Sequence, residues 1–264
     1  MTVAPAVPAG LAKLLPAGAI IDTDRFFAEF YAPEQGQHHA FLGPNGCGKT
    51  TMAIRCLVTA REMHPAQRAV ALAMKPDKGP KSDGKKATGD LTVAQLTRRY
   101  GGRIIRTFPP VRAPWQKEPT FWTFWPRHTM RPKIDRPAHT EAFGEALLHC
   151  YNQGDWWVFA DEVKSLDDEL GLEDEVETIL TKGRSMKCGG MFATQRPANV
   201  TLYVYTESKH FFMWRVTDER AYERLAQIGG GMIDKRQCME IMKKLRKHDC
   251  LYLYPEQGVM AVLV

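Results

Sequence analysis

A glycine-rich stretch, GPNGCGKTT at residues 43–51, holds the most specific chemical signal in the sequence. It has the spacing G-x-x-x-x-G-K-[ST] of loops that bind nucleotide phosphates. Glycines let backbone N–H groups turn toward phosphate oxygens, Lys49 can reach the β- and γ-phosphates, and the Thr50 hydroxyl can ligate Mg²⁺. The stretch therefore predicts binding of ATP with Mg²⁺ by the whole loop: Gly43, Pro44, Asn45, Gly46, Cys47, Gly48, Lys49, Thr50 and Thr51.

An acidic pair, Asp161-Glu162, ends the apolar run WWVFADE. A phosphate-binding loop needs a carboxylate that holds the Mg²⁺ shell, and Asp161 stands at the end of a predicted strand, the position of a Walker B aspartate. Glu162 can polarise the water that attacks the γ-phosphate, which predicts hydrolysis rather than transfer to a small molecule. The alternative for Glu162 is a cap on the helix that follows.

Two further polar residues flank the next apolar segment, residues 189–194. Gln195 follows this predicted strand, where its amide can sense the γ-phosphate and orient the attacking water. Arg184 lies in a glycine-flanked loop before the strand, and a guanidinium that reaches a neighbouring subunit's γ-phosphate would stabilise charge in the transition state. A surface arginine is the alternative for Arg184. Arg196 is the second candidate for the same finger.

Apolar segments alternate with helical patterns and place these residues at the ends of strands. The segments that predict strands are HHAFLG, AVALAMK, RIIRTF, WWVFADE, GGMFATQRP and HFFMWR. The patterns that predict helices cover residues 50–64, 91–101, 140–154, 172–184, 218–228 and 236–249. This alternation predicts an α/β fold, a RecA/ASCE-like P-loop NTPase with a mainly parallel sheet, helices on both faces and a C-terminal β-hairpin at 250–264.

Composition along the chain predicts a short arm and one domain. Residues 1–18 are rich in Ala and Pro and are expected to form a flexible N-terminal arm. Residues 19–264 are expected to form a single P-loop ATPase domain. Within it, the segment from about 109 to 137 is dense in Pro, Trp and Arg, which predicts an irregular insertion packed on the sheet.

Charge and cysteine content narrow the class of protein. The chain has 36 Lys and Arg against 30 Asp and Glu, which gives a net charge of +6. This charge favours binding to polyanions such as DNA or RNA. The alternative is a basic soluble protein with no polyanionic partner. The cysteines form no C-x-x-C pair and no zinc-type cluster, which predicts reduced, mostly buried thiols. Prolines interrupt the N-terminus and no apolar run approaches the length of a transmembrane helix, so a cytoplasmic protein without a membrane segment is expected.

The motifs together resemble the HerA/FtsK superfamily of DNA-pumping ATPases. In that family an arginine precedes the strand after Walker B, and this strand ends in a Thr-Gln-Arg-Pro-like sequence, as at residues 194–197. The later strand, turn and acidic helix, Phe211 to Leu225, is similar as well. The loop GPNGCGKTT also resembles an ABC ATPase, but residues 139–157 carry no LSGGQ-like signature before the Walker B strand.

The resemblance implies a homo-oligomeric ring, a pentamer or hexamer, that hydrolyses ATP at subunit interfaces and moves double-stranded DNA through its pore. By this resemblance Thr50 and Asp161 hold Mg²⁺, and the catalytic residues are Lys49, Glu162, Gln195 and Arg184. A nearly bare motor is most similar to the packaging ATPases of small viruses and phages. That similarity adds a portal or capsid protein as a partner and the host cytoplasm, at the capsid vertex, as the location.

Basic residues after the second predicted strand are the candidates for contact with DNA: Lys75, Lys78, Lys81, Lys85 and Lys86. In a ring such a loop could line the pore and grip phosphates without sequence preference. A solvated charged loop is the alternative.

Two other functions stay open: a same-fold ATPase that acts on protein in assembly, secretion or conjugation coupling, and a nucleotide-dependent switch without DNA translocation.

Overall fold

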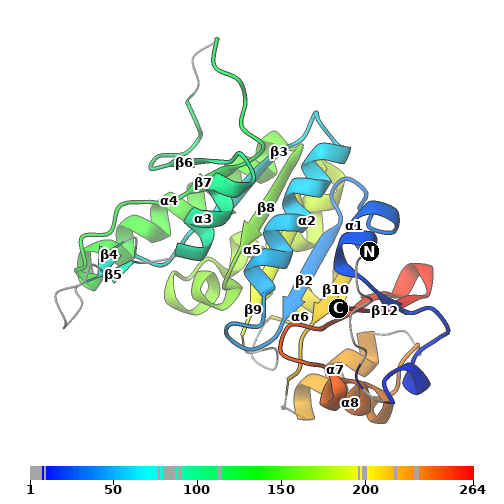
Figure 1. The fold of residues 1–264 in the computed structure, drawn as a ribbon. Helices are drawn as coiled ribbons and strands as arrows, with labels where there is room; N and C mark the ends of the chain where they lie inside the picture. The colour runs from blue at the N-terminus through cyan, green and yellow to red at the C-terminus, as the bar shows by residue number, and fades with distance from the viewer. Residues whose placement is uncertain are drawn as a thin grey trace. The chain divides into compact units, whose positions relative to one another are not determined.

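The computed structural model describes the chain apart from residues 1–7, 9, 77, 80–86, 89, 90, 112–114, 196, 198–200, 217, 218 and 229–231. The chain forms two compact units, whose elements are labelled in Figure 1. Unit 1 comprises Met1–Pro33, His38–Lys49 and Thr194–Val264, and unit 2 comprises Glu34–Gln37 and Thr50–Ala193. The expectation of one domain over 19–264 stays a prediction.

Unit 1 is built on strands in the order β1-β12-β11-β10-β2. Their bounds are Ile20–Ile21 for β1, His38–Leu42 for β2, Ser208–Met213 for β10, Cys250–Tyr254 for β11 and Val259–Leu263 for β12. Strands β10 and β2 run parallel, whereas β11 is antiparallel to both β10 and β12. The predicted C-terminal hairpin is therefore confirmed, and β1 extends it by parallel pairing with β12.

Short helices cover the strands of unit 1. They are α1 (Thr23–Glu29), α6 (Leu202–Thr206), α7 (Glu219–Ile228) and α8 (Lys235–Lys244), with 3-10 turns at Ala12–Leu14 and Pro255–Gln257. Helix α1 begins after Asp22, whose carboxylate accepts hydrogen bonds from the N–H groups of Asp24 and Arg25. The aromatic ring of Phe26 then packs edge-on against Phe212 of β10 and Tyr252 of β11, which fixes α1 on this sheet.

Unit 2 carries a parallel sheet in the order β9-β8-β3-β7-β6. The bounds are Arg68–Leu72 for β3, Arg103–Ile105 for β6, Trp122–Phe124 for β7, Trp156–Ala160 for β8 and Gly189–Thr194 for β9, whose last residue falls in unit 1. Strands β8 and β9 are buried along their whole length, as expected where helices cover both faces of a parallel sheet. A separate antiparallel pair joins β4 (Lys78–Gly79) to β5 (Ala87–Thr88).

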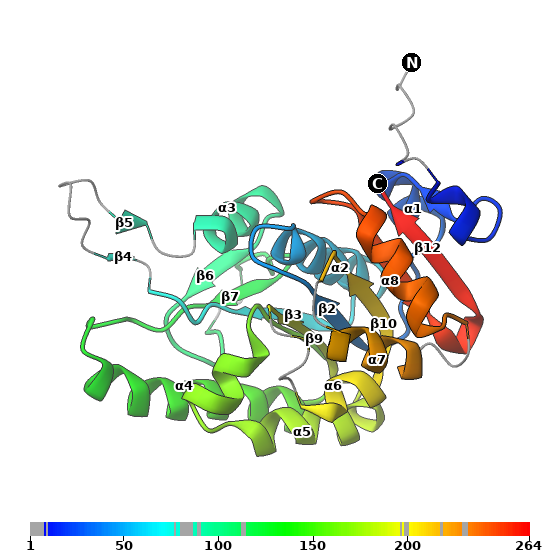
Figure 2. The same cartoon turned by 90° about the horizontal axis from the view of Figure 1, so that it is seen from below.

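Helices lie on both faces of the unit 2 sheet, as Figure 2 shows. Helices α2 (Lys49–Met63) and α3 (Leu91–Arg99) cover one face, and α4 (Pro132–Gln153) and α5 (Glu173–Lys182) cover the other. A π-helical turn at Ser165–Glu169 and a 3-10 turn at Gly183–Met186 precede and follow α5. This arrangement is the predicted α/β architecture, with helices on both faces of the sheet.

Part of the segment 109–137 forms regular structure. Strand β7 pairs with β3 on one side and β6 on the other, and α4 begins at Pro132. Trp122 and Trp125 are buried, while Trp115 is exposed. A three-residue strand is too short to show a pattern, and Pro137 lies inside α4, where a proline normally indicates a break. These features explain why the sequence indicated irregular structure here.

Candidate nucleotide-binding site

The glycines of the loop after β2 are required by backbone geometry. Gly46 and Gly48 have φ angles of 69° and 113°, which L side chains rarely adopt. A Cβ atom at Gly43 would lie 2.7 Å from the Cβ of Trp214, which follows β10. The loop therefore turns tightly against the end of β10, in a form that side chains at these positions would prevent.

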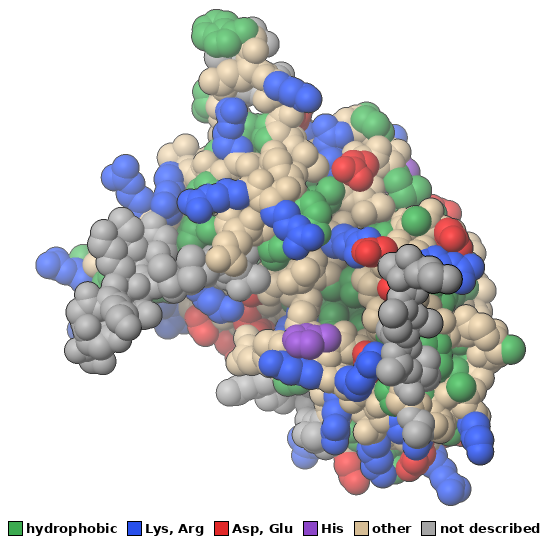
Figure 3. Space-filling model, in the orientation of Figure 1, with side chains coloured by type: hydrophobic (Ala, Val, Ile, Leu, Met, Phe, Trp, Pro, Cys, Tyr) green, Lys and Arg blue, Asp and Glu red, His purple; other side chains and the backbone are tan. Residues whose placement is uncertain are grey.

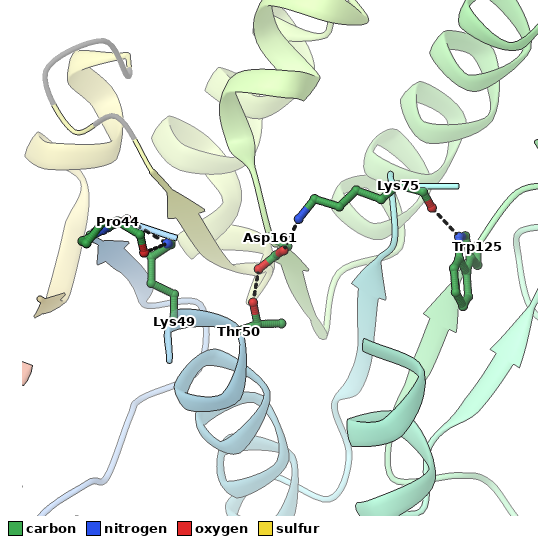
Figure 4. Close-up of polar contacts among 7 residues, drawn as sticks. Pro44, Lys49, Thr50, Lys75, Trp125 and Asp161 are labelled. Carbon is green, nitrogen blue, oxygen red and sulfur yellow. Dashed lines mark hydrogen bonds and ion pairs between the residues drawn. The ribbon is translucent and has the colours of Figure 1, made fainter. Parts of the chain in front are cut away.

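Lys49 folds back over this loop. Its ammonium donates hydrogen bonds to the carbonyl oxygens of Gly43, over 2.7 Å, and Pro44, over 2.8 Å (Figure 4). Lys49 is only 6% exposed, and a buried ammonium needs such acceptors. These bonds place the positive charge on the loop that the sequence assigns to phosphate binding.

The hydroxyl of Thr50 and the carboxylate of Asp161 meet within unit 2. Thr50 Oγ1 donates a 2.5 Å hydrogen bond to Asp161 Oδ1, although 111 positions separate the two residues in the chain (Figure 4). Thr50 lies in the first turn of α2, and Asp161 directly follows β8. Hydroxyl and carboxylate oxygens are ligands that Mg²⁺ prefers, so this pair fits a magnesium site.

The same carboxylate has a second partner that the sequence did not indicate. Lys75 Nζ lies 3.2 Å from Asp161 Oδ2 (Figure 4). Sequence reasoning grouped Lys75 with the DNA candidates because it precedes a basic loop. Lys75 follows β3, which pairs in parallel with β8, so the carboxyl ends of both strands reach the same edge of the sheet.

Glu162 is the second residue after β8 and Gln195 is the first residue after β9, as the sequence predicts. Glu162 is half-buried, and its carbonyl oxygen accepts a hydrogen bond from the N–H of Ser165 in the helical segment that follows. This position suits either a catalytic base or a helix cap. Gln195 is also half-buried and follows Thr194, whose carbonyl oxygen accepts from the N–H of Gly43 over 3.2 Å. The backbone of Gln195 therefore follows directly after the residue that bonds to the first glycine of the loop.

Arg184 lies at the opposite end of β9 from Gln195. Its side chain is exposed, and within the described part of the chain no acceptor pairs with its guanidinium. Strands β8 and β9 run parallel, so the six residues of β9 separate Arg184 from the edge that carries Asp161. At about 3.3 Å per residue this is about 20 Å. Arg184 therefore does not join the Asp161 group within unit 2, and Arg196 lies outside the described residues.

The loop between α8 and β11 contacts the glycine-rich loop, which sequence reasoning missed. His248 Nδ1 lies 3.0 Å from the carbonyl oxygen of Cys47, although 201 positions separate these residues. Burial raises the pKa of the Cys47 thiol, and the nearby charges of Lys49 and Lys247 offset only part of this rise. Cys47 is thus a buried thiol of the loop, and His248 has no motif that could have indicated the contact.

Comparison with known proteins identifies the fold. No family model and no curated protein sequence matches the chain. The chain is similar to the genome packaging NTPase B204 from Sulfolobus turreted icosahedral virus 2 in complex with ATP-gammaS, with a TM-score of 0.55 and 11% identity over 88% of this chain and 98% of that one. The chain is also similar to the DNA-packaging ATPase B204 from Sulfolobus turreted icosahedral virus, with a TM-score of 0.54 and 12% identity over 88% of this chain and 98% of that one. A third similar structure is the cytoplasmic domain of the Thermomonospora curvata Type VII secretion ATPase EccC, with a TM-score of 0.50 and 14% identity over 86% of this chain and 25% of that one.

The fold is that of a P-loop NTPase. The predicted fold class is therefore confirmed. The likeness to B204 and EccC shows the fold alone, and the resemblance to the HerA/FtsK superfamily, drawn from the motifs, is compatible with that fold. Sequence identities of this size show a common fold, and the activity of this chain is a separate question.

The residues proposed for DNA contact lie mostly outside the described residues, namely Lys81, Lys85 and Lys86. The backbone of Lys78 begins β4 and pairs with Thr88, and its role stays a prediction. Figure 3 shows Lys and Arg side chains gathered with Asp and Glu over the part of the surface formed by α7 and α8. Among the described helices none is long and apolar enough to cross a membrane.

Proposed function

We propose that this P-loop NTPase hydrolyses ATP with Mg²⁺ and uses the energy to move double-stranded DNA through a homo-oligomeric ring. The hydrogen bond between Thr50 Oγ1 and Asp161 Oδ1 is the observation that carries the proposal. It joins the hydroxyl of a Walker A motif to the carboxylate of a Walker B motif. Because these groups come from distant segments, their contact is what a magnesium–nucleotide site requires.

Each residue of the site has a role in this mechanism. Lys49 would contact the β- and γ-phosphates, and Thr50 and Asp161 would hold the metal. Mg²⁺ held there would supply positive charge that offsets the charge of the phosphates. Glu162 takes a proton from the attacking water, and Gln195 orients that water.

A second subunit completes the site in our proposal. The exposed guanidinium of Arg184 and its distance of about 20 Å from the Asp161 edge support a role in trans rather than in its own subunit. An arginine that reaches a neighbour's γ-phosphate stabilises the charge of the transition state. A closed ring, a pentamer or hexamer, gives every subunit such a neighbour.

DNA is the substrate that we propose for the motor, in the packaging of a viral genome. The net charge of +6 supports a polyanionic partner, and the fold is similar to two packaging enzymes named B204. We propose a portal or capsid protein as a further partner, and the host cytoplasm, at the capsid vertex, as the location.

A same-fold ATPase that acts on protein is the second candidate. The structural likeness to the secretion ATPase EccC supports it, at a TM-score of 0.50. This candidate predicts that a protein partner stimulates turnover and that DNA has little effect.

Steady-state ATP turnover with and without duplex DNA tests the proposal. We expect turnover to rise on addition of duplex DNA at low salt, and to be lost with or without DNA in Glu162→Gln. Turnover that ignores DNA in a sample of confirmed oligomeric mass contradicts DNA translocation and favours the protein substrate. If the unchanged protein binds ATP without turnover, this contradicts the proposed ATPase activity and favours a nucleotide-dependent switch.

A further inference from the structure

The Asp161 carboxylate is shared between two donors in unit 2. Thr50 Oγ1 donates to Oδ1, and the Lys75 ammonium pairs with Oδ2 at 3.2 Å. The Asp161 side chain is 12% exposed and that of Lys75 is 52% exposed. The carboxylate is therefore shielded from solvent, while the cation reaches it from the surface.

The backbone at Lys75 is held by side chains that follow β7. Trp125 Nε1 donates a 2.8 Å hydrogen bond to the carbonyl oxygen of Lys75 (Figure 4), and His128 Nε2 lies 3.1 Å from the carbonyl oxygen of Met74. Trp125 is itself buried. Because the main chain is anchored, the Lys75 ammonium can leave Asp161 by rotation of its own side chain while the backbone stays in place.

An ordinary surface ion pair would not be expected to matter. Exposed pairs contribute little because water screens both charges and two flexible side chains must be ordered. Here one partner is mostly buried and also hydrogen-bonded to Thr50, and the other has an anchored backbone. The pair also occupies the carboxylate that the ATPase proposal assigns to the metal.

We propose that Lys75 is a positioning residue of the magnesium site, which holds Asp161 before the metal–nucleotide complex binds and competes with Mg²⁺ for the carboxylate. This inference rests on the proposed ATPase function. One carboxylate cannot be fully neutralised by an ammonium and also give its full charge to a divalent cation. Mg²⁺ binding therefore displaces the ammonium from Oδ2, and Lys75 weakens Mg²⁺ binding while keeping Asp161 oriented.

The test measures how binding of a fluorescent, non-hydrolysable ATP analogue depends on Mg²⁺ concentration. Lys75→Met removes the competing charge and keeps most of the length of the unbranched side chain. We expect the Mg²⁺ midpoint to fall about 5-fold, the size of one partly exposed charge pair. Lys75→Arg retains a cation and is expected to keep the midpoint of the unchanged protein. Loss of the Lys75 contact also removes one restraint on Asp161, but Thr50 still holds Oδ1, so removal of the competing charge is expected to dominate. A residue that only oriented Asp161 would raise the Mg²⁺ midpoint on substitution.

Lys164→Met is the matched control. Lys164 lies three positions after Asp161 and pairs with Asp168 at 2.5 Å, so its loss removes the same charge from a different carboxylate. Its Mg²⁺ midpoint should stay within about 2-fold of the unchanged protein, because the effect is specific to the carboxylate that is paired. An equal fall in both variants would overturn the specific role of Lys75.

The two proposals fail in different ways. If the unchanged protein binds the analogue with a clear Mg²⁺ dependence and Lys75→Met has the same or a higher midpoint, only the Lys75 proposal is overturned. If the unchanged protein binds the analogue without any Mg²⁺ dependence, the ATPase proposal fails and the Lys75 proposal fails with it. Thermal unfolding of Lys75→Met checks that the variant folds, which the half-exposed side chain predicts.

Discussion

Single residues from separate segments meet at the end of β8. Asp161 accepts from Thr50 of the first turn of α2 and pairs with Lys75 at the end of β3. Glu162 follows in the chain, so the carboxylate proposed to hold the metal and the carboxylate proposed to activate water are adjacent in the sequence. Two adjacent carboxylates can have different chemical roles when their surroundings differ. Substitution can separate the proposed role of Glu162 from that of Asp161.

Glu162→Gln should bind ATP and lose turnover by about 10²- to 10⁴-fold, because the amide cannot accept the proton of the attacking water. Nucleotide affinity and single-turnover hydrolysis measure the two effects separately. Glu169→Gln, an exposed acid in the same helical segment, is the matched control and should hydrolyse ATP normally. Normal turnover by Glu162→Gln with a loss of about 1 kcal/mol in stability would instead indicate a helix cap.

At the scale of elements, the glycine-rich loop is shaped by the strand beside it. The end of β10 leaves no space for a side chain at Gly43, and the α8–β11 loop contacts the carbonyl of Cys47 through His248. The proposed phosphate binding therefore depends on packing in unit 1 as well as on the motif. Residues on β10 and β2 also form the aromatic core beneath the loop, including the stacked imidazoles of His39 and His210, with ring centroids 4.4 Å apart.

Gly43→Ala should lower the free energy of unfolding by about 1–3 kcal/mol, because the added Cβ would lie 2.7 Å from the Cβ of Trp214. Urea denaturation measures the change. Thr51→Ala changes an exposed side chain in the same stretch and should leave stability within about 0.5 kcal/mol. Equal stability of the Gly43→Ala variant and the unchanged protein would contradict the close approach of loop and strand.

Stability should fall as the pH is lowered below 6.5, because of His210. Burial lowers the pKa of this imidazole from 6.5 to about 3, and its Nδ1 lies 2.8 Å from the Tyr252 hydroxyl. Above pH 6.5 His210 is neutral in both states. Between pH 6.5 and about 3 only the unfolded chain takes the proton, so the free energy of unfolding falls with falling pH. The loss from pH 6.5 to 5 is about 2 kcal/mol.

Urea denaturation at pH 7 and pH 5 checks this dependence. His210→Gln, which does not titrate, should lose less stability over this interval than the unchanged protein. The same loss in both proteins would show that other groups cause the pH dependence.

Sequence patterns predicted the strands whose sequences are mostly apolar, and the motifs at the ends of those strands. Strands β8 and β9 could be predicted because a buried parallel strand is a nearly continuous apolar run, and they end at Asp161 and beside Gln195. Strand β2 begins with two histidines and was predicted as a short strand that runs into the glycine-rich loop. Strand β7 was missed because three residues between prolines give no period. The partners Lys75 and His248 were missed because their contacts arise from tertiary packing, which a single sequence does not encode locally.

At the scale of the whole molecule, the proposed motor needs more than one chain. Arg184 is exposed at the end of β9 opposite to Gln195, so its predicted catalytic role requires a second copy. The chain also carries a net charge of +6, although basic residues such as Lys243 and Arg246 are engaged with Glu240 and Asp249. Both features are consistent with a ring around a polyanion, and each can be tested in the assembled protein.

Arg184→Ala should lower turnover by about 10³-fold or more while ATP binding is largely kept, since a finger stabilises charge that develops in the transition state. Turnover in mixtures of variant and unchanged subunits measures the trans effect. Activity should fall more steeply than the fraction of unchanged subunits, because each variant subunit also leaves the site of its neighbour without an arginine finger. Normal turnover by Arg184→Ala would move the finger to Arg196 or exclude a finger in trans.

Displacement of a triplex-forming oligonucleotide from duplex DNA measures movement along DNA directly. With ATP and Mg²⁺ the account predicts displacement at a rate that follows hydrolysis, and none with a non-hydrolysable analogue or with Glu162→Gln. A duplex without the triplex strand serves as the control for DNA-stimulated turnover. Turnover that rises with duplex DNA but displaces no third strand would contradict the claim that ATP hydrolysis drives this protein along DNA.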